Sequence, residues 1–199
     1  MLSKNIHLTN DKETITPIFY IDQYQDEKVK AIFNAYKFKN ARKNQYLLDL
    51  CIDIAIDNIT KNSQSDIIFT YPPSTMFYRK EKDIDSMGNL IWQVKKYLNF
   101  YFRKDKERYY FKSLFSINQK YLRGKKAQHI DGNKSTRTKD LNKRYYLSFL
   151  DRRFLKKLSK RKTIIVIIDD VSSTGGTLLA CKNCLKGFDV EVELYSLAH

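Results

Sequence analysis

The chain has 199 residues, of which 42% are hydrophobic, enough for a single domain with a buried core. No apolar run approaches the roughly 20 residues of a membrane-spanning helix, and the first residues contain no apolar stretch typical of a signal peptide. We therefore expect a cytoplasmic protein without a membrane span. It is expected to form one domain over 1–199, in which 1–15 are a loose N-terminal segment.

Positive charge is concentrated in one part of the chain. The net charge is +15, and residues 95–161 contain 22 basic and 5 acidic residues, a net of +17. The remaining residues sum to −2. Codon usage that favours lysine would explain abundant lysine but not the local shortage of acids. A block of one sign that carries the whole excess favours a polyanionic partner.

The first half of the chain alternates between strand-like and helix-like patterns. Apolar residues at helical spacing indicate helices, and short apolar runs indicate strands. Strands are predicted over 16–21 and 66–71, and helices over 26–38, 44–59 and 88–102. The second strand is followed at once by Pro72 and Pro73, which end it.

The second half continues the alternation after a long polar segment over 118–143. Strands are predicted over 108–117, 163–168 and 190–198, and helices over 145–161 and 177–188. Continuous apolar strands that alternate with helices are typical of an α/β fold. We therefore predict a mostly parallel sheet with helices on both faces.

The stretch "IIVIIDDVSSTGGTLL", residues 164–179, places two acids and a hydroxyl- and glycine-rich loop after an apolar strand. Asp169 and Asp170 fall at the carboxyl end of that strand, where ligands bind in open α/β folds. The loop leads into a helix, whose N-terminus carries about half a positive charge. Its candidate ligand-binding residues are Ser172, Ser173, Thr174, Gly175, Gly176 and Thr177.

This loop has the chemistry of a phosphate cradle without a lysine. The neighbouring acids would repel a phosphate, but they can accept hydrogen bonds from sugar hydroxyls and orient a hydrated magnesium ion. Phosphate beside a diol describes a ribose 5-phosphate. Two alternatives are an acidic turn that caps the helix and a Walker B strand. The latter needs an upstream GxxxxGK[ST] loop, and "GNKST" at Gly132 has Asn133 where that motif needs lysine.

The pattern from Ile165 to Thr177 resembles the phosphoribosyl pyrophosphate (PRPP) signature of type I phosphoribosyltransferases. The resemblance implies that fold, PRPP as ligand, and magnesium as cofactor, oriented by Asp169 and Asp170 without a separate structural metal site. It also implies a loop for the pyrophosphate after the strand at 66–71. The candidates in that loop are Pro73, Ser74, Thr75, Arg79 and Lys80. The catalytic residues stay unassigned.

Segments outside this signature resemble ComF-family proteins, which are tied to natural transformation. They are 26–40, 71–91 and the closing "VEVELYSLAH", with Gln128, Arg137 and Asn142 loosely matching between them. The resemblance implies single-stranded DNA and competence-machinery proteins as partners. Family members often begin with a four-cysteine zinc finger, which this sequence lacks. The alternatives are a nucleobase salvage or amide-type phosphoribosyltransferase and a sensor of PRPP.

The basic block is the part of the sequence that fits a nucleic acid. Lys and Arg neutralise phosphates, and aromatic residues interleaved with them, as over 97–112 and 144–157, offer stacking for unpaired bases. Most of these aromatic residues are nevertheless expected in the core. The candidate nucleic-acid residues are Arg103, Lys104, Arg108, Arg144, Arg152, Arg153, Lys156 and Lys157.

Overall fold

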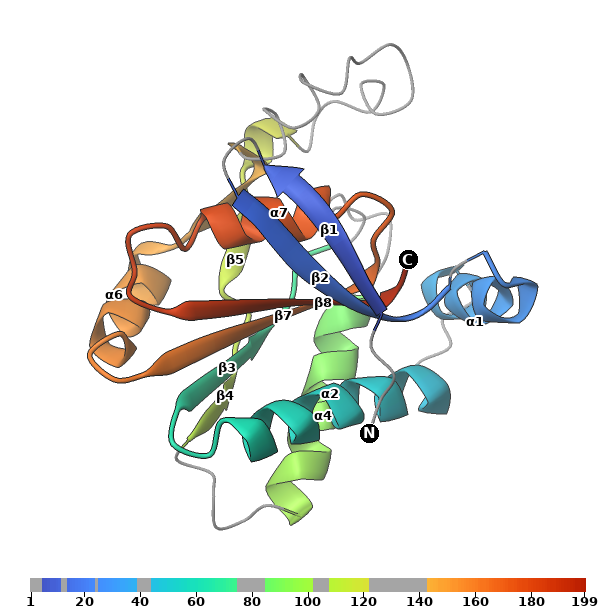
Figure 1. The fold of residues 1–199 in the computed structure, drawn as a ribbon, viewed down its shortest axis with the longest axis horizontal. Helices are drawn as coiled ribbons and strands as arrows, with labels where there is room; N and C mark the ends of the chain where they lie inside the picture. Colours follow the sequence, from blue (N-terminus) through green and yellow to red (C-terminus); the bar gives the residue numbers. More distant parts are fainter. Residues whose placement is uncertain are drawn as a thin grey trace.

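A computed structural model describes residues 5–11, 14–23, 25–38, 44–74, 85–101, 108–121 and 143–199. Its strands are β1 (Asn5–Asp11), β2 (Thr14–Asp22), β3 (Asp66–Thr70), β4 (Tyr109–Phe111), β5 (Phe115–Ile117), β6 (Tyr145–Leu147), β7 (Thr163–Val171) and β8 (Glu191–Ala198). Its helices are α1 (Glu27–Phe38), α2 (Gln45–Lys61), α4 (Ser86–Tyr101), α6 (Phe149–Leu158) and α7 (Gly176–Asn183), with a short 3₁₀ helix over Gln119–Tyr121. Figure 1 shows their arrangement.

The main sheet has six strands in the order β1-β2-β8-β7-β3-β4. Only the β1–β2 pair is antiparallel, and the pairs β2–β8, β8–β7, β7–β3 and β3–β4 are parallel. The predicted α/β fold with a mostly parallel sheet is therefore confirmed. β7 lies inside the sheet between β8 and β3, so its carboxyl end faces the same edge as theirs.

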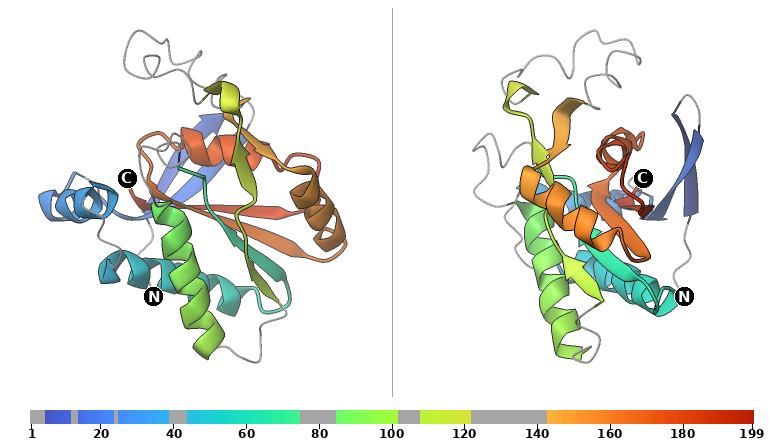
Figure 2. Two further views of the ribbon diagram at one scale, coloured as in Figure 1. Left: turned by 180° about the vertical axis from the view of Figure 1, so that it is seen from behind. Right: turned by 90° about the vertical axis from the view of Figure 1, so that its left-hand side faces the viewer.

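Helices cover both faces of this sheet (Figures 1 and 2). Residues of α1, α2 and α4 pack on one face, and residues of α6 and α7 pack on the other. β7 serves both cores, because Val166 belongs to the first and Ile165 and Ile167 belong to the second. A strand buried on both faces requires a continuous apolar run, which explains the sequence of residues 164–168.

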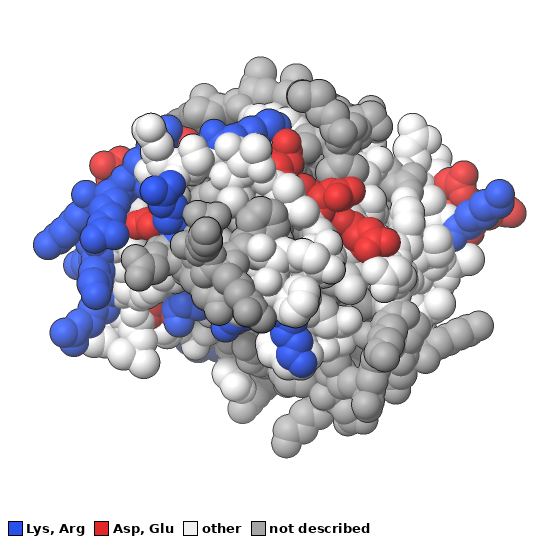
Figure 3. Space-filling model, turned by 90° about the horizontal axis from the view of Figure 1, so that it is seen from below, with Lys and Arg blue, Asp and Glu red and all other residues white. Residues whose placement is uncertain are grey.

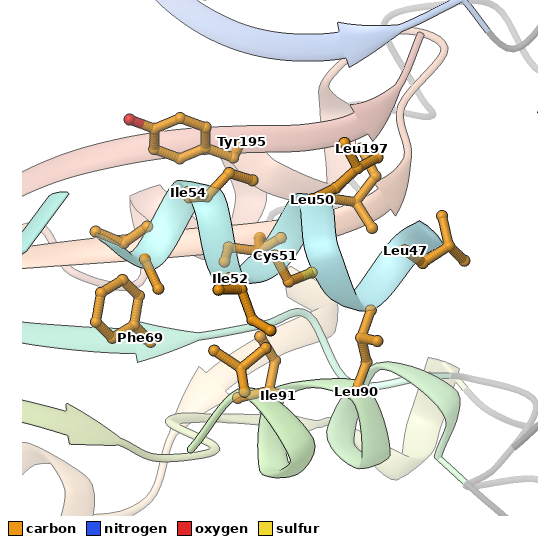
Figure 4. Packing of buried hydrophobic residues seen from close by; sticks show 14 of the residues in the cluster. Leu47, Leu50, Cys51, Ile52, Ile54, Phe69, Leu90, Ile91, Tyr195 and Leu197 are labelled. Carbon is orange, nitrogen blue, oxygen red and sulfur yellow. The ribbon is translucent and has the colours of Figure 1, made fainter. Parts of the chain in front are cut away.

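The first core is a layer of side chains between the sheet and two helices (Figure 4). Leu50 and Ile54 of α2 face β8, where Tyr195 is almost fully buried. Ile52 of α2 faces Ile91 of α4 on the opposite side. The helical spacing of the apolar residues in α2 thus packs it against both neighbours.

The structure differs from two predicted elements of the basic block. The single strand expected over 108–117 is divided into β4, which pairs with β3, and β5, which pairs with β6. The helix expected over 145–161 begins only at Phe149, and Tyr145–Leu147 form strand β6. The reason is Ser148, whose extended backbone lies outside the helix and whose hydroxyl accepts from Asp151 N at 3.2 Å to cap α6.

A strand precedes the first predicted one. β1 runs antiparallel to β2, from Asn5 opposite Tyr20 to Asp11 opposite Thr14. Residues 1–15, which we expected as a loose segment, therefore contain all of β1 and the first residues of β2. Across the described residues, no helix has the length and apolar character needed to cross a membrane.

Candidate functional site

The two acids of the motif are among the last residues of strand β7. Both are half-buried, and Asp169 lies opposite Ser196 of β8 in the parallel register. Asp170 N donates to Asp169 Oδ1 at 2.9 Å, and Val171 N donates to Asp170 Oδ1 at 2.7 Å. Each carboxylate is thereby oriented by the amide of the residue that follows it.

Asp169 and Asp170 serve opposite faces of the sheet, as expected for successive strand residues. Burial first, and then the charge of Asp170, raises the pKa of Tyr36 in α1. The pKa of Asp85, just before α4, is likewise raised by burial and to a lesser extent by Asp170. Asp169 instead contributes, after burial, to the raised pKa of Tyr145 in β6. A ligand that contacts both acids must therefore lie across the edge of the sheet.

The loop after β7 is fastened to the sheet at its first residue. Ser172 is buried, its N–H donates to Ala198 O at 3.0 Å, and its carbonyl oxygen contacts His199 Nδ1. The Ser172 hydroxyl accepts from Gly175 N at 2.8 Å. Gly175 precedes α7 with a φ of 70°, a left-handed conformation that favours glycine. Ser172 and Gly175 thus set the shape of the loop.

The remaining motif residues form the exposed part of the loop and the start of α7. Ser173 and Thr174 are exposed, and Gly176 and Thr177 form the start of α7. N–H groups in the first turn of a helix have no partner within that helix, and the helix end adds about half a positive charge. Hydroxyls, amides and the helix dipole therefore meet at one exposed loop, which suits a phosphate.

The turn after β3 lies beside this loop, as the predicted pyrophosphate site requires. Thr70 is paired with Ile167, so the residues that follow β3 come next to the end of β7. Pro73 is buried and Ser74 is half-buried in that turn. The other three candidates of this loop, Thr75, Arg79 and Lys80, lie outside the described residues.

The structure adds a group that sequence reasoning did not identify: Tyr71, Asp85 and Gly88. Asp85 Oδ1 accepts from Gly88 N at 3.4 Å at the start of α4, and the Tyr71 side chain hydrogen-bonds to Asp85. A Cβ at position 88 would lie 2.5 Å from Tyr71 Oη and 3.2 Å from Asp85 Oδ2. Gly88 is therefore the residue that permits this close packing.

Tyr36 joins the same group from α1. The residue is only 5% exposed, and its hydroxyl has no hydrogen-bond partner among the described residues. Its electrostatic interactions are with Asp170, Cys51, Asp85 and Tyr71. No local pattern signals this group, because Tyr36 has the spacing of a core residue and Asp85 that of a helix cap. Only the fold brings positions 36, 71, 85 and 170 together.

The cations of the basic block that the structure describes occupy several elements. Arg152, Arg153, Lys156 and Lys157 are exposed on α6. Arg108 is exposed before β4, and Arg144 is half-buried before β6. Figure 3 shows Lys and Arg gathered at the left, on the side of the molecule where α6 lies. A separate group of acids lies to the right of the centre. Arg103 and Lys104 lie outside the described residues.

The donor set at the end of β7 fits magnesium bound with a phosphorylated ligand. Magnesium prefers oxygen ligands and is usually held by one or two carboxylates together with substrate phosphates and water. Asp169 and Asp170 supply carboxylates of this kind. Within the described ranges, no group of three or more His, Cys, Asp or Glu side chains converges as a metal site.

Comparison with known proteins does not assign the chain to a group. No model of a protein family matches the sequence, and a search of curated proteins finds no match.

Proposed function

We propose that the chain binds PRPP, or a related ribose 5-phosphate, together with Mg²⁺ at the carboxyl end of β7. The observation that carries this proposal is the loop Ser172–Thr177, which is fastened to the sheet edge directly after Asp169 and Asp170. The motif resembles the PRPP signature of type I phosphoribosyltransferases, and the α/β architecture agrees with that fold. We therefore propose that the protein is ComF-like.

Each part of PRPP has a counterpart in the site. The 5-phosphate accepts hydrogen bonds from Ser173, Thr174 and the first-turn amides of α7. The ribose lies across the sheet edge, so that its hydroxyls donate to Asp169 on one side and to Asp170 on the other. The pyrophosphate lies toward Ser74 and the basic residues that follow it in sequence. Bound Mg²⁺ supplies positive charge that stabilises the pyrophosphate.

Turnover would be a displacement at the anomeric carbon of the ribose. A nucleophile forms a bond to that carbon while the bond to the pyrophosphate oxygen breaks, and pyrophosphate leaves with the electron pair. Asp169 and Asp170 stabilise the positive charge that builds on the ribose ring. The acceptor decides whether the protein is a salvage or amide-type enzyme, in which case a base or amine is consumed with PRPP.

Calorimetric titration tests the site, with PRPP, ribose 5-phosphate and pyrophosphate each added in the presence of Mg²⁺. PRPP should bind most tightly, because it alone fills all parts of the site. The test variant is Asp169→Asn combined with Asp170→Asn. Its control is Asp53→Asn, which neutralises an exposed carboxylate on α2. It should bind PRPP as the wild type does. Absence of PRPP binding by the wild type would refute the proposal. Pyrophosphate release with a panel of bases then tests turnover.

The proposal extends to single-stranded DNA, handled in the cytoplasm with competence proteins as partners. The supporting observation is the exposed row of cations on α6, at positions 152, 153, 156 and 157. We expect the protein to retard a labelled oligonucleotide at about 0.15 M salt, near physiological ionic strength. A salvage enzyme would show no such binding. A negative result would remove the DNA role and leave the ribose-phosphate site to its own test.

A further inference from the structure

Helix α4 exposes a row of large aromatic side chains. Trp92 is 51% exposed, Phe100 is 64% exposed and Tyr101 is 63% exposed. The same helix buries Leu90 and Leu98 almost completely on its other side. The core side of α4 is thus apolar and closed, and the exposed rings form a second, outward apolar surface.

Trp92 contacts a cation, and Tyr101 contacts the rings of Tyr97 and Phe100. Residues four apart share a helix face, which aligns Trp92 with Lys96 and Phe100. Lys96 Nζ lies 3.6 Å from the centre of the Trp92 ring. The Tyr97 and Tyr101 rings are 4.5 Å apart, and those of Phe100 and Tyr101 are 5.0 Å apart. The outward side of α4 therefore carries a Trp92–Lys96 pair and a group of three aromatic rings.

The charge of α4 indicates what kind of partner this surface fits. The helix contains Lys95 and Lys96 and no Asp or Glu. A second copy of the chain, with its own net charge of +15, would bring like charges together. Flat rings next to cations, without acids, are the combination that stacks unpaired bases while attracting their phosphates.

We propose that the outward face of α4, formed by Trp92, Lys96, Tyr97, Phe100 and Tyr101, is a stacking surface for the bases of single-stranded nucleic acid. This inference rests on the proposed DNA role, and it separates two functions within that role. The cations of α6 bind phosphates of the strand. The aromatic face of α4 binds its bases, and it supplies most of the discrimination against polyanions that have no bases.

The two faces are connected by the edge strand of the sheet. β4 lies between α4 and α6 (Figure 2). On the α4 side, the Tyr109 hydroxyl donates to Leu98 O at 3.3 Å. On the α6 side, the Tyr110 ring lies 5.8 Å from the Phe154 ring, and both line a hollow that also includes Lys157. A single strand of nucleic acid that crosses β4 would therefore contact the cations of α6 and the aromatic rings of α4 in succession.

Trp92 is the only tryptophan in the chain, so its fluorescence reports on α4 directly. Titration with oligo(dT) should quench the Trp92 emission as bases stack on the helix. Inorganic polyphosphate of matched charge has no bases, so it should compete for the cations and leave the emission nearly unchanged. Quenching by both polyanions to the same extent would show that stacking is not involved.

A double variant, Phe100→Ala with Tyr101→Ala, tests the surface while keeping the Trp92 probe. Its Kd for oligo(dT) should rise between about fivefold and about 150-fold per base that loses its ring. Its affinity for polyphosphate should not change. The control is Tyr46→Ala, which removes an exposed aromatic ring from α2 and leaves α4 unchanged. Unchanged circular dichroism would show that both variants fold.

The outcomes separate this inference from the proposed function. If the wild type binds oligo(dT) but Trp92 emission is constant and the double variant binds equally well, the stacking surface is wrong and the DNA role stands. If no oligonucleotide binds even at low salt, the stacking surface and the DNA role are both wrong. The PRPP titration tests the ribose-phosphate site independently. If sedimentation shows a wild-type dimer that the double variant dissociates without a change in DNA affinity, α4 contacts a second copy and the inference is refuted.

Discussion

The end of β7 and the α6 surface are both proposed to bind phosphate, but they are built in different ways. At β7 a few residues are oriented by backbone hydrogen bonds, such as the one from Gly175 N to Ser172. On α6 the cations at 152, 153, 156 and 157 are exposed, and Arg152 Nε also donates to Leu147 O at 3.2 Å. Affinity at the end of β7 should therefore depend on single atoms, whereas affinity at the α6 surface should depend on the sum of its charges.

The largest effect is expected on the charged surface, when its whole charge is reversed. The variant replaces four residues of α6 by glutamate: Arg152, Arg153, Lys156 and Lys157. Every phosphate that is no longer neutralised reduces the salt slope for a single strand by about 0.7, so the slope should fall by up to about 2.8. PRPP affinity should be unchanged. The measurement is oligonucleotide affinity over a salt series.

A charge-matched control shows whether position matters on that surface. It reverses four exposed lysines elsewhere: Lys28, Lys30, Lys61 and Lys186. We expect it to keep most of the salt slope. If both variants lose DNA binding equally, net charge alone drives the binding and α6 has no special part in it.

At β7, Asp169→Asn combined with Asp170→Asn should weaken PRPP binding at least about tenfold, because a hydrogen bond to a charged group is worth about 1.5–3 kcal/mol. The single variants sharpen the comparison. Since the two carboxylates serve opposite faces of the sheet, each should weaken binding separately and their effects should add. Calorimetry measures both. Single variants with wild-type affinity would show that neither carboxylate meets the ribose.

Alanine substitutions at two glycines with positive φ test whether PRPP binding depends on the shape of the loop after β7. Gly175 has a φ of 70° and Gly187 has a φ of 93°, with open space around the latter. Each change to alanine should lower the free energy of unfolding by about 1–2 kcal/mol, because left-handed backbone is strained with a Cβ. Only Gly175→Ala should also weaken PRPP binding. Equal PRPP affinities in both variants would mean that the loop shape is unimportant.

The smallest effect concerns Asp85. Burial raises its pKa, so the folded state keeps the proton to a higher pH than the unfolded chain. Its contribution to stability is present below the unfolded pKa, near 4, and is lost as pH rises through the raised pKa of the folded state. Asp85→Asn removes this titration and retains an acceptor that caps α4. It should therefore flatten the decline in stability above about pH 4.

The contrasting variant, Asp85→Ala, loses both the charge and the cap. The missing cap should cost about 1 kcal/mol at every pH. Urea unfolding at several pH values distinguishes the two variants. The hydrogen bond with Tyr71 lowers the pKa of Asp85, so Tyr71→Phe should raise that pKa further and extend the decline in stability to higher pH. Parallel curves for wild type and Asp85→Asn would contradict the assignment.

The elements predicted from the sequence are those whose apolar pattern has a single interpretation. α2 shows helical spacing along its whole length, and residues 164–168 form an apolar run that fits only a buried strand. β6 was missed because Tyr145 and Leu147 continue into an apolar helix pattern, and Ser148 divides them by its backbone conformation. β1 has only Ile6 and Leu8 as alternating apolar residues, a pattern too short to recognise.

Within the candidate site, the motif after β7 was predictable and its surroundings were not. The acids and the loop are consecutive in the chain, so their proximity follows from the sequence. The opposite orientation of Asp169 and Asp170 requires that β7 extend to Val171, beyond the predicted end at 168. The group of Tyr36, Tyr71 and Asp85 depends on packing between elements, which local patterns do not encode.

The position of β7 within the sheet also sets a gradient of motion along the motif. Ile164–Ile168 are almost fully buried between two neighbouring strands and two cores, whereas Ser173 and Thr174 are exposed. Amide hydrogens should therefore exchange most slowly in the strand and rapidly in the loop, within one short stretch of the chain. The carboxylates of Asp169 and Asp170 belong to the strand, where exchange should be slow. A ligand has only the loop to order, and the entropy lost on binding should be confined to those few residues.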